Sequence, residues 1–355
     1  MTDLSHSATW REIHAQPAIW RDWGRSLDVT GLRGWIAGLD ISDVWFCGAG
    51  SSAFVGDIVV AALEGAPGPM RRAIPTTDLV SRPQTYLSGR KPLIVNFGRS
   101  GNSSETIATL DLLDTLCPTA PRLNITCNGG SVLAMRSAAD QRVVVLPAVT
   151  HDVGFAMTSS FTTMALTALA LFDHSVTDSA IPAVLDTLSG GATAILAAVS
   201  VPVLPERVVF MGTGPGAFVA REAALKVMEL SAGRIPALWE STLGFRHGPK
   251  SFVIGATDLY LFTAADSPAN LYEADLAAEL RQQFPQCRVT TVGPGGDVDL
   301  PPQTWGFLLP VILAQVLAVG WSDALGLTVD DPFQGQGTLS RVVSGVRLHG
   351  ATGAA

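Results

Sequence analysis

The sequence VWFCGAGSSAFVGD, residues 44–57, is repeated in outline as VVFMGTGPGAFVAR, residues 208–221. Each copy begins with a short apolar run, continues with Gly-x-Gly and a small linker, and ends with Ala-Phe-Val at the start of a helical stretch. Such apolar runs are typical of strands buried on both faces of a parallel sheet, and the glycines permit a tight turn into the helix. The repeat predicts two copies of one α/β unit.

The next segments of the two copies also correspond. PLIVNFGRSGNSSETIATL (92–110) and LYLFTAADSPANLYEADLA (259–277) each contain a β-like run, a polar turn and an amphipathic helix. This order predicts an α/β fold in which each copy is a mainly parallel sheet with helices on both faces. Further strands are expected at 123–127, 143–146 and 288–292.

The length of 355 residues predicts about two domains. We expect a helical segment at 1–35, a first domain at 36–190 and a second domain at 205–345. The Ala-, Gly-, Ser- and Pro-rich stretch 181–205 is expected to contain a helix and the connector between the halves.

Composition excludes several classes of protein. A hydrophobic content of 47% excludes a disordered chain, and a net charge of −8 argues against a nucleic-acid surface. The polar N-terminus lacks the apolar core of a signal peptide, and the apolar stretch 305–321 is expected to be too short to span a bilayer. We therefore expect a cytoplasmic protein with no membrane partner. The four cysteines show neither metal-site nor disulfide spacing, so no metal is expected.

The loop 48–52, Gly-Ala-Gly-Ser-Ser, places small residues and two hydroxyls at a helix N-terminus, where unpaired N–H groups attract an anion. Simple helix capping by Ser51 or Ser52 is the alternative. The loop 98–106 is more specific, because it gathers hydroxyls, an amide and glycine in one strand-to-helix turn. It matches neither the dinucleotide nor the nucleoside-triphosphate motif, so a sugar phosphate fits better.

These loops, Ser100-Gly101-Asn102-Ser103 above all, resemble the phosphosugar-binding loops of the sugar isomerase (SIS) domain family. EIHAQPAIW (12–20), FAMTSSFTTM (155–164) and REAALKVMELSAG (221–233) with ESTLGFRHGPKSF (240–252) resemble the galactosamine-6-phosphate deaminase/isomerase branch, also called tagatose-6-phosphate ketose/aldose isomerases. The chain is also similar to the isomerase half of glucosamine-6-phosphate synthase. The resemblance implies two tandem flavodoxin-like domains with five-stranded sheets. The phosphosugar-binding residues that it implies are Gly50, Ser51, Ser52, Arg99, Ser100, Asn102, Ser103, Thr158, Ser159 and Arg341.

Isomerising a phosphorylated sugar requires ring opening and a proton transfer between C2 and C1, for which a carboxylate base is suited. Glu222 and Lys226 lie four residues apart and can pair on one helical face, and Glu229 follows near the helix end. Spacing alone leaves open that all three form a solvated stripe. The family resemblance implies that Glu229 is the C1/C2 proton shuttle, with Glu240 as the alternative base.

His247 is flanked by Gly244, Gly248 and Pro249, so it is expected on a loop, where a histidine that titrates near neutrality suits ring opening. The resemblance implies that this histidine comes from the neighbouring subunit, and hence a homodimer with shared active sites. Arg246 and Lys250 are expected to pair with acids or to touch phosphate.

Two positions depart from the related synthases. Gly98 stands where the synthases have a hydroxyl, and Arg99 either compensates by binding phosphate or faces solvent. The tail with Asp331-Pro332 and TLSR (338–341) resembles the segment that closes the site, but Arg341 replaces a lysine. A guanidinium does not readily relay protons, so Arg341 is interpreted as a binding or lid residue.

The resemblance implies conversion of galactosamine 6-phosphate to tagatose 6-phosphate and ammonia, without a metal or other cofactor. The alternatives are glucosamine-6-phosphate deamination, plain tagatose-6-phosphate isomerisation, and a non-catalytic sugar-phosphate sensor. A sensor needs an output module, and no basic helix-turn-helix segment is evident in the sequence.

Overall fold

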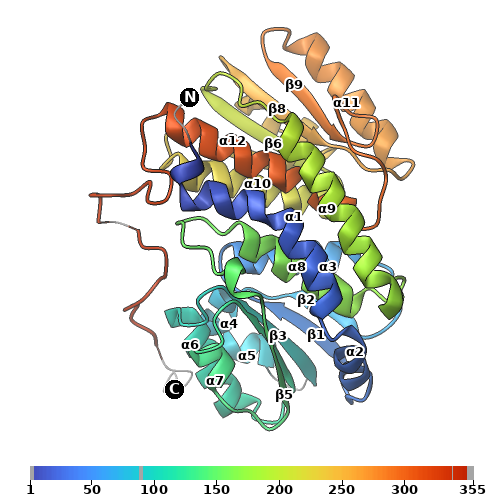
Figure 1. Ribbon diagram of the computed structural model, residues 1–355, viewed down its shortest axis with the longest axis vertical. Helices are drawn as coiled ribbons and strands as arrows, with labels where there is room; N and C mark the ends of the chain where they lie inside the picture. The colour runs from blue at the N-terminus through green and yellow to red at the C-terminus, as the bar shows by residue number, and fades with distance from the viewer. Residues whose placement is uncertain (1–3, 88–90, 338, 350–355) are drawn as a thin grey trace. The chain divides into compact units, whose positions relative to one another are not determined.

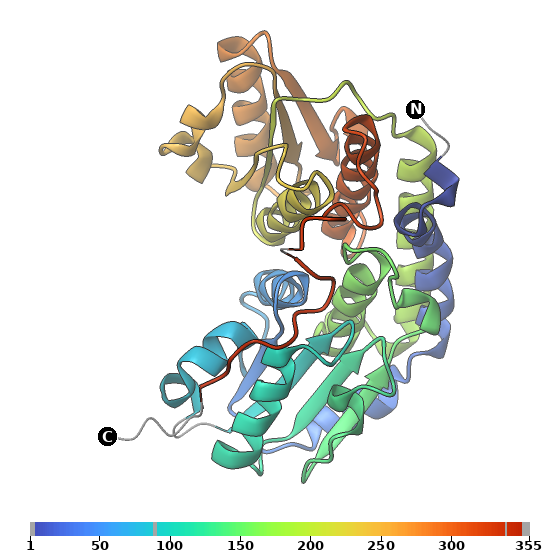
Figure 2. The same cartoon turned by 90° about the vertical axis from the view of Figure 1, so that its left-hand side faces the viewer.

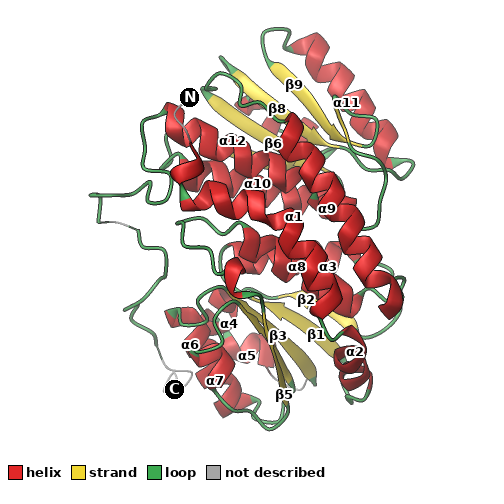
Figure 3. Ribbon diagram, viewed as in Figure 1, coloured by secondary structure: helices red, strands yellow, loops and turns green. Residues whose placement is uncertain are grey.

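The computed structural model describes residues 4–87, 91–337 and 339–349, and in this part of the chain it contains two compact α/β units (Figure 1). The first unit comprises residues 1–25, 153–158 and 182–338, and the second comprises 26–152, 159–181 and 339–355. The N-terminal helix therefore belongs with the sheet near the C-terminus of the chain, and the C-terminal tail belongs with the sheet near the N-terminus. Figure 3 shows the alternation of helices and strands in each unit.

The described part of the second unit contains a five-stranded sheet in which every pair of neighbours is parallel. Its order is β2 (Met70–Ala73), β1 (Asp43–Cys47), β3 (Pro92–Gly98), β4 (Arg122–Thr126) and β5 (Gln141–Val145). All residues of β1, β3 and β4 are buried, as their continuous apolar character predicts.

Within the described residues, the sheet of the first unit also has five parallel strands. Its order is β7 (Ala237–Ser241), β6 (Arg207–Gly212), β8 (Thr257–Phe262), β9 (Arg288–Gly293) and β10 (Val298–Asp299). Counted along each copy, both sheets have the order 2-1-3-4-5, which is the flavodoxin-like arrangement. The predicted duplicated α/β fold is confirmed.

The helices of the second unit are α2 (Val29–Ala37), α3 (Ser51–Ala62), α4 (Thr76–Ser81), α5 (Pro83–Leu87), α6 (Ser104–Leu116), α7 (Val132–Met135) and α8 (Ser159–Phe172). The first unit contains α1 (Ala8–Ser26), α10 (Pro215–Leu230), α11 (Ala269–Gln283), α12 (Pro310–Ala324) and, from Pro182 onward, α9 (Ile181–Ala198). Figure 2 shows α10 beside α12, seen from their ends.

The two copies share the backbone of their first strand-to-helix turn. Gly50 has φ +57° and Gly214 has φ +54°, a region that L side chains rarely adopt. A Cβ on Gly48 would lie 2.5 Å from the backbone of Ser52, and one on Gly212 would lie 2.5 Å from the backbone of Gly216. In each Gly-x-Gly, the first glycine is therefore required by close backbone approach and the second by its positive φ, which agrees with the predicted tight turn.

The expectation that the apolar stretch near 305–321 is too short to cross a bilayer is wrong. The helical stretch Gly306–Ala324 has 19 residues and a mean hydropathy of 1.7, which suffices by length and composition. However, 83% of it is buried within the protein, so it packs as a core helix, and core helices share this composition. One other described helix, Asp178–Ala198, passes the same test of length and composition.

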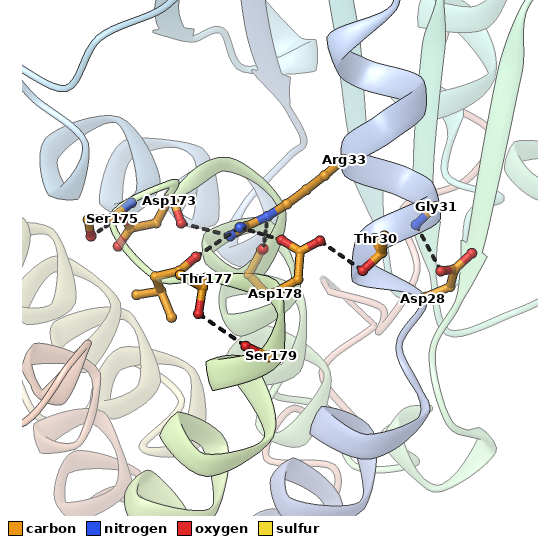
Figure 4. A network of polar contacts seen from close by, with 11 residues as sticks. Asp28, Thr30, Gly31, Arg33, Asp173, Ser175, Thr177, Asp178 and Ser179 are labelled. Atoms are coloured by element: carbon orange, nitrogen blue, oxygen red, sulfur yellow. Dashed lines mark hydrogen bonds and ion pairs between the residues drawn. The ribbon is translucent and has the colours of Figure 1, made fainter.

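Arg33 on α2 binds the end of α8 and the segment that follows it through hydrogen bonds and an ion pair (Figure 4). Its guanidinium donates to the carbonyl oxygens of Ala170 (2.9 Å), Asp173 (2.7 Å) and Val176 (2.8 Å) and forms an ion pair with Asp178 (2.8 Å). A cation at this position satisfies carbonyls at the C-terminal end of α8 and interacts favourably with the helix dipole.

We predict that Arg33→Ala lowers the free energy of unfolding by about 2–4 kcal/mol, because buried carbonyl oxygens lose their donors. The measurement is urea denaturation followed by circular dichroism. Arg82→Ala, which removes an exposed arginine of the same unit, is the control and should unfold like the wild type. Equal midpoints for the two variants would contradict the role of Arg33.

Candidate active site

The candidate phosphate half-site lies in the second unit, in the loops that follow β1, β3 and β4. Parallel strands bring these loops to one edge of the sheet. In the β1–α3 turn, Ser51 and Ser52 are buried in the first turn of α3, and the N-cap position is taken by Gly50 without a side-chain cap. The alternative that either serine is the helix cap is therefore wrong.

The loop 99–103 after β3 is held by the neighbouring β4–α7 loop. Gly101 has φ +64°, and a Cβ there would lie 2.4 Å from the Ser131 hydroxyl. The Asn102 side-chain oxygen accepts a hydrogen bond from the Val132 N–H (2.8 Å), and the Asn128 amide donates to the Ser100 carbonyl (3.2 Å). These contacts hold the loop backbone in place through protein groups, and such pre-organisation lowers the ordering cost of binding.

Ser103 is the N-cap of α6 and accepts a hydrogen bond from the Thr106 N–H (3.3 Å). The Ser100 hydroxyl accepts one from the Asn102 N–H (3.3 Å). The Ser103 hydroxyl therefore sits at the N-terminus of α6, where backbone N–H groups and the helix dipole favour an anion, and Ser100 lies three residues before it in the loop.

Arg99 is only 7% exposed, so the alternative in which it faces solvent is wrong. Its Nη2 donates to the carbonyl oxygen of Arg341 (2.8 Å), and the Ser104 N–H donates to the carbonyl oxygen of Val343 (3.2 Å). The C-terminal tail thus lies against loop 99–103 and the start of α6. Thr338, the first residue of the tail motif, lies outside the described residues.

Arg341 itself is exposed, and its guanidinium donates to the Asp152 carbonyl oxygen. The Asp152 carboxylate is fully buried at the start of α8 and accepts hydrogen bonds from the N–H groups and hydroxyls of Ser159 and Ser160. The Ser159 hydroxyl is therefore directed to a carboxylate of its own unit. Thr158, assigned to the first unit, is fully buried.

Sequence reasoning did not single out His151. It is half-buried, and its pKa is lowered by burial and then by the charges of Arg341 and Arg99, with Asp152 opposing the shift. Only the fold could reveal it, since a single histidine after a strand carries no sequence signal.

The candidate catalytic half-site lies in the first unit, in the last two turns of α10. Lys226 is fully buried and forms ion pairs with Glu222, 3.3 Å away and also fully buried, and with Glu229. The interpretation of these residues as a solvated stripe is wrong. Burial alone would lower the pKa of Lys226, but the attraction of the two carboxylates outweighs it and raises that pKa.

Glu229 differs from Glu222 in being 24% exposed. The C-terminal end of a helix carries partial negative charge, which disfavours a carboxylate there, and Lys226 offsets this effect. Lys226 thus holds one accessible carboxylate in a fixed position. Glu240, at the end of β7, instead accepts hydrogen bonds from the N–H (2.7 Å) and hydroxyl (3.0 Å) of Ser241.

His247 lies in a loop, as predicted, and it is exposed. The neighbouring cations are engaged: Arg246 pairs with Glu279 at 2.7 Å, and Lys250 pairs with the same carboxylate. This confirms the expectation that these cations pair with acids. Among the described residues, no cluster of His, Cys, Asp or Glu suited to a metal ion is present.

Comparison with known proteins identifies the family of the chain. The SIS domain model matches residues 40–173, and D-galactosamine-6-phosphate deaminase AgaS from Escherichia coli is 36% identical over 97% of this chain and 96% of its own length. The chain belongs to the AgaS family of SIS-domain proteins.

Solved structures are also similar to this AgaS-family protein. Tagatose-6-phosphate ketose/aldose isomerase from Escherichia coli has a TM-score of 0.86 and 31% identity, and the match covers 99% of each chain. The C-terminal domain of glucosamine-fructose-6-phosphate aminotransferase from Francisella tularensis, with a TM-score of 0.74, 17% identity and coverage of 93% and 99%, shares the fold.

We predict that Lys226→Met lowers the free energy of unfolding by about 3–5 kcal/mol, because the buried carboxylate of Glu222 loses the ammonium group that lies 3.3 Å away. The double variant Glu222→Gln/Lys226→Met should recover most of this loss, since no uncompensated charge remains on the pair. Urea denaturation of the single and double variants measures the coupling. Additive losses would contradict the ion pair as the source of the effect.

Proposed function

We propose that this AgaS-family protein converts galactosamine 6-phosphate to tagatose 6-phosphate and ammonia. The observation that carries the proposal is the buried Lys226, which holds a partly exposed carboxylate, Glu229, at the end of a helix, in a chain that also has a preformed phosphate loop. The named activity of the Escherichia coli relative agrees with this pairing of features.

The phosphate loop would bind the 6-phosphate through the N-terminus of α6, Ser100, Asn102 and Ser103, with Arg99 supplying positive charge. The first-turn residues Gly50, Ser51 and Ser52 are proposed to contribute further contacts to the sugar phosphate. Arg341, on the tail that rests on this loop, is proposed to bind the same ligand. Ser159 is the least suited of the predicted residues because its hydroxyl already serves Asp152.

The proton transfer is assigned to Glu229. After His247 assists ring opening, the Glu229 carboxylate removes the proton from C2 of the open-chain amino sugar, and an enolamine forms. Return of the proton to C1 gives a C2 imine, and water then adds to C2 and expels ammonia, which leaves the keto sugar phosphate. Lys226 is a positioning residue in this scheme, because it acts by holding Glu229.

Plain tagatose-6-phosphate isomerisation is the second candidate, favoured by the name of the Escherichia coli structure. The same proton shuttle serves a substrate with a hydroxyl at C2, but no ammonia is released. Ammonia release from galactosamine 6-phosphate and glucosamine 6-phosphate, measured in parallel with identification of the sugar product, separates the alternatives. Release mainly from the gluco epimer would move the activity to glucosamine-6-phosphate deamination, and binding without any turnover would indicate a sensor.

We predict that Glu229→Gln lowers kcat for ammonia release by about 10²–10⁴-fold, because the amide cannot accept the C2 proton. Binding of the substrate should persist. Glu64→Gln, which neutralises an exposed glutamate, is the matched control and should keep wild-type turnover. Unchanged turnover in Glu229→Gln would remove Glu229 from the mechanism.

We also infer a homodimer in which the exposed His247 serves the active site of the partner. Mixing refolded Glu229→Gln and His247→Ala protomers tests this, because each mixed dimer would then regain one intact site. About a quarter of the wild-type activity is expected from random pairing in a twofold dimer. If His247 acted within its own subunit, every site in the mixture would lack one of the two groups and no activity would return.

A further inference from the structure

Two asparagines, Asn96 on β3 and Asn124 on β4, lie opposite each other in the sheet of the second unit. They are only 3% and 1% exposed, in strands whose every residue is buried. The side-chain amide of Asn96 donates to the side-chain oxygen of Asn124 (2.8 Å). A buried polar side chain costs free energy unless its groups are hydrogen-bonded, and a leucine at either position would carry no such cost. Packing of the sheet alone therefore does not explain the pair.

The hydrogen bonds of the two side chains differ. The side-chain oxygen of Asn96 is buried and has no partner among the described residues, which is unfavourable for stability. The side-chain amide of Asn124, in contrast, donates to the carbonyl oxygen of Leu133 (2.9 Å) at the start of α7. Asn124 therefore connects the sheet to α7, and Asn96 is connected to α7 through Asn124.

The position of α7 depends on such tertiary contacts. This helix has only four residues, and helices shorter than about 12 residues are marginal on their own in water. Leu133 anchors α7 with a fully buried side chain, and the hydrogen bond from Asn124 fixes the backbone of the same residue. The buried amide thus sets the distance of the first turn of α7 from β4.

The first turn of α7 in turn holds loop 99–103. The Leu133 N–H donates to the Gly101 carbonyl oxygen (3.1 Å), and the Val132 N–H donates to the Asn102 side chain (2.8 Å). There is little room for adjustment, because a Cβ on Gly98 would lie 2.9 Å from the Leu133 side chain. Leu133 therefore receives a hydrogen bond from the sheet on its carbonyl and gives one to the loop from its N–H.

We propose that Asn124 is a positioning residue for phosphate binding. Through Leu133 it holds the backbone of Gly101, and a site in which loop groups and a helix N-terminus bind one anion requires those groups to be held in place. Asn96 acts one step further away, because its hydrogen bond goes to Asn124. The inference rests on the proposed function, in which loop 99–103 binds the 6-phosphate.

The test is calorimetric titration of the full-length protein with tagatose 6-phosphate. Asn124→Leu should weaken binding about tenfold or more, because the Leu133 carbonyl loses its donor and the loop loses its support. The matched control is Asn96→Leu, which removes the neighbouring amide but leaves the hydrogen bond between Asn124 and Leu133 in place. It should bind tagatose 6-phosphate like the wild type.

The double variant Asn96→Leu/Asn124→Leu separates positioning from stability. Replacing both partners leaves no unpaired amide between the strands, so this variant should resist urea at least as well as Asn124→Leu. It should nevertheless bind tagatose 6-phosphate as weakly as Asn124→Leu. With galactosamine 6-phosphate, both variants should raise KM and leave kcat unchanged, because Glu229 belongs to the other unit.

Arg99→Ala locates the bound ligand, since Arg99 belongs to loop 99–103 and its loss should weaken binding. No binding to the wild type, or equal binding to Arg99→Ala and the wild type, would overturn both the proposed phosphate site and the role of Asn124. Weaker binding in Arg99→Ala, together with equal affinities in Asn124→Leu and Asn96→Leu, would overturn the role of Asn124 alone. Wild-type affinity in the double variant would also overturn only that role, because the effect of Asn124→Leu would then follow from lost stability.

Discussion

The parallel direction of every described strand is the constraint on which the rest of this structure depends. Parallel neighbours are usually joined by crossover segments, and here helical segments follow the strands and cover both faces of the sheet, whereas β9 and β10 are joined by the short segment 294–297. All carboxyl ends then meet at one edge of each sheet. Ser100, after β3, and Asp266, after β8, lie at such edges for this reason.

The turn from the first strand of each copy into its helix leaves no room for a side chain at its first glycine. A Cβ on Gly48 or Gly212 would collide with backbone four residues later. The two turns have kept the same backbone conformation, while the side chains around them have changed from hydroxyls and arginine to a carboxylate and prolines. The same backbone turn thus lies beside a hydroxyl- and arginine-bearing loop in one unit and beside the segment Ala-Ala-Asp-Ser-Pro in the other.

The ion pairs of Lys226 with Glu222 and Glu229 on α10 are the second constraint on this structure. A lysine with no exposed surface must be compensated, and Glu222 supplies a fully buried partner while Glu229 remains partly exposed. Removing either charge leaves an uncompensated group in a low-dielectric interior. Burying Lys226 and Glu222 costs desolvation energy. In return, Lys226 holds the accessible carboxylate of Glu229 in place, and a proton shuttle requires a carboxylate held in this way.

The sequence by itself determined the duplicated α/β fold, the strand-to-helix turn at 98–106 and the loop position of His247, because these depend on local patterns: apolar runs, glycines at tight turns and helix breakers. Short edge strands such as β2 and β10 had no such pattern. Only the tertiary structure decided that Lys226 is buried rather than solvated, that Arg99 contacts the tail, that Asp152 uses the Ser159 hydroxyl, and that His151 lies near Arg99 and Arg341. Burial and pairing are set by segments far apart in sequence, which no local spacing encodes.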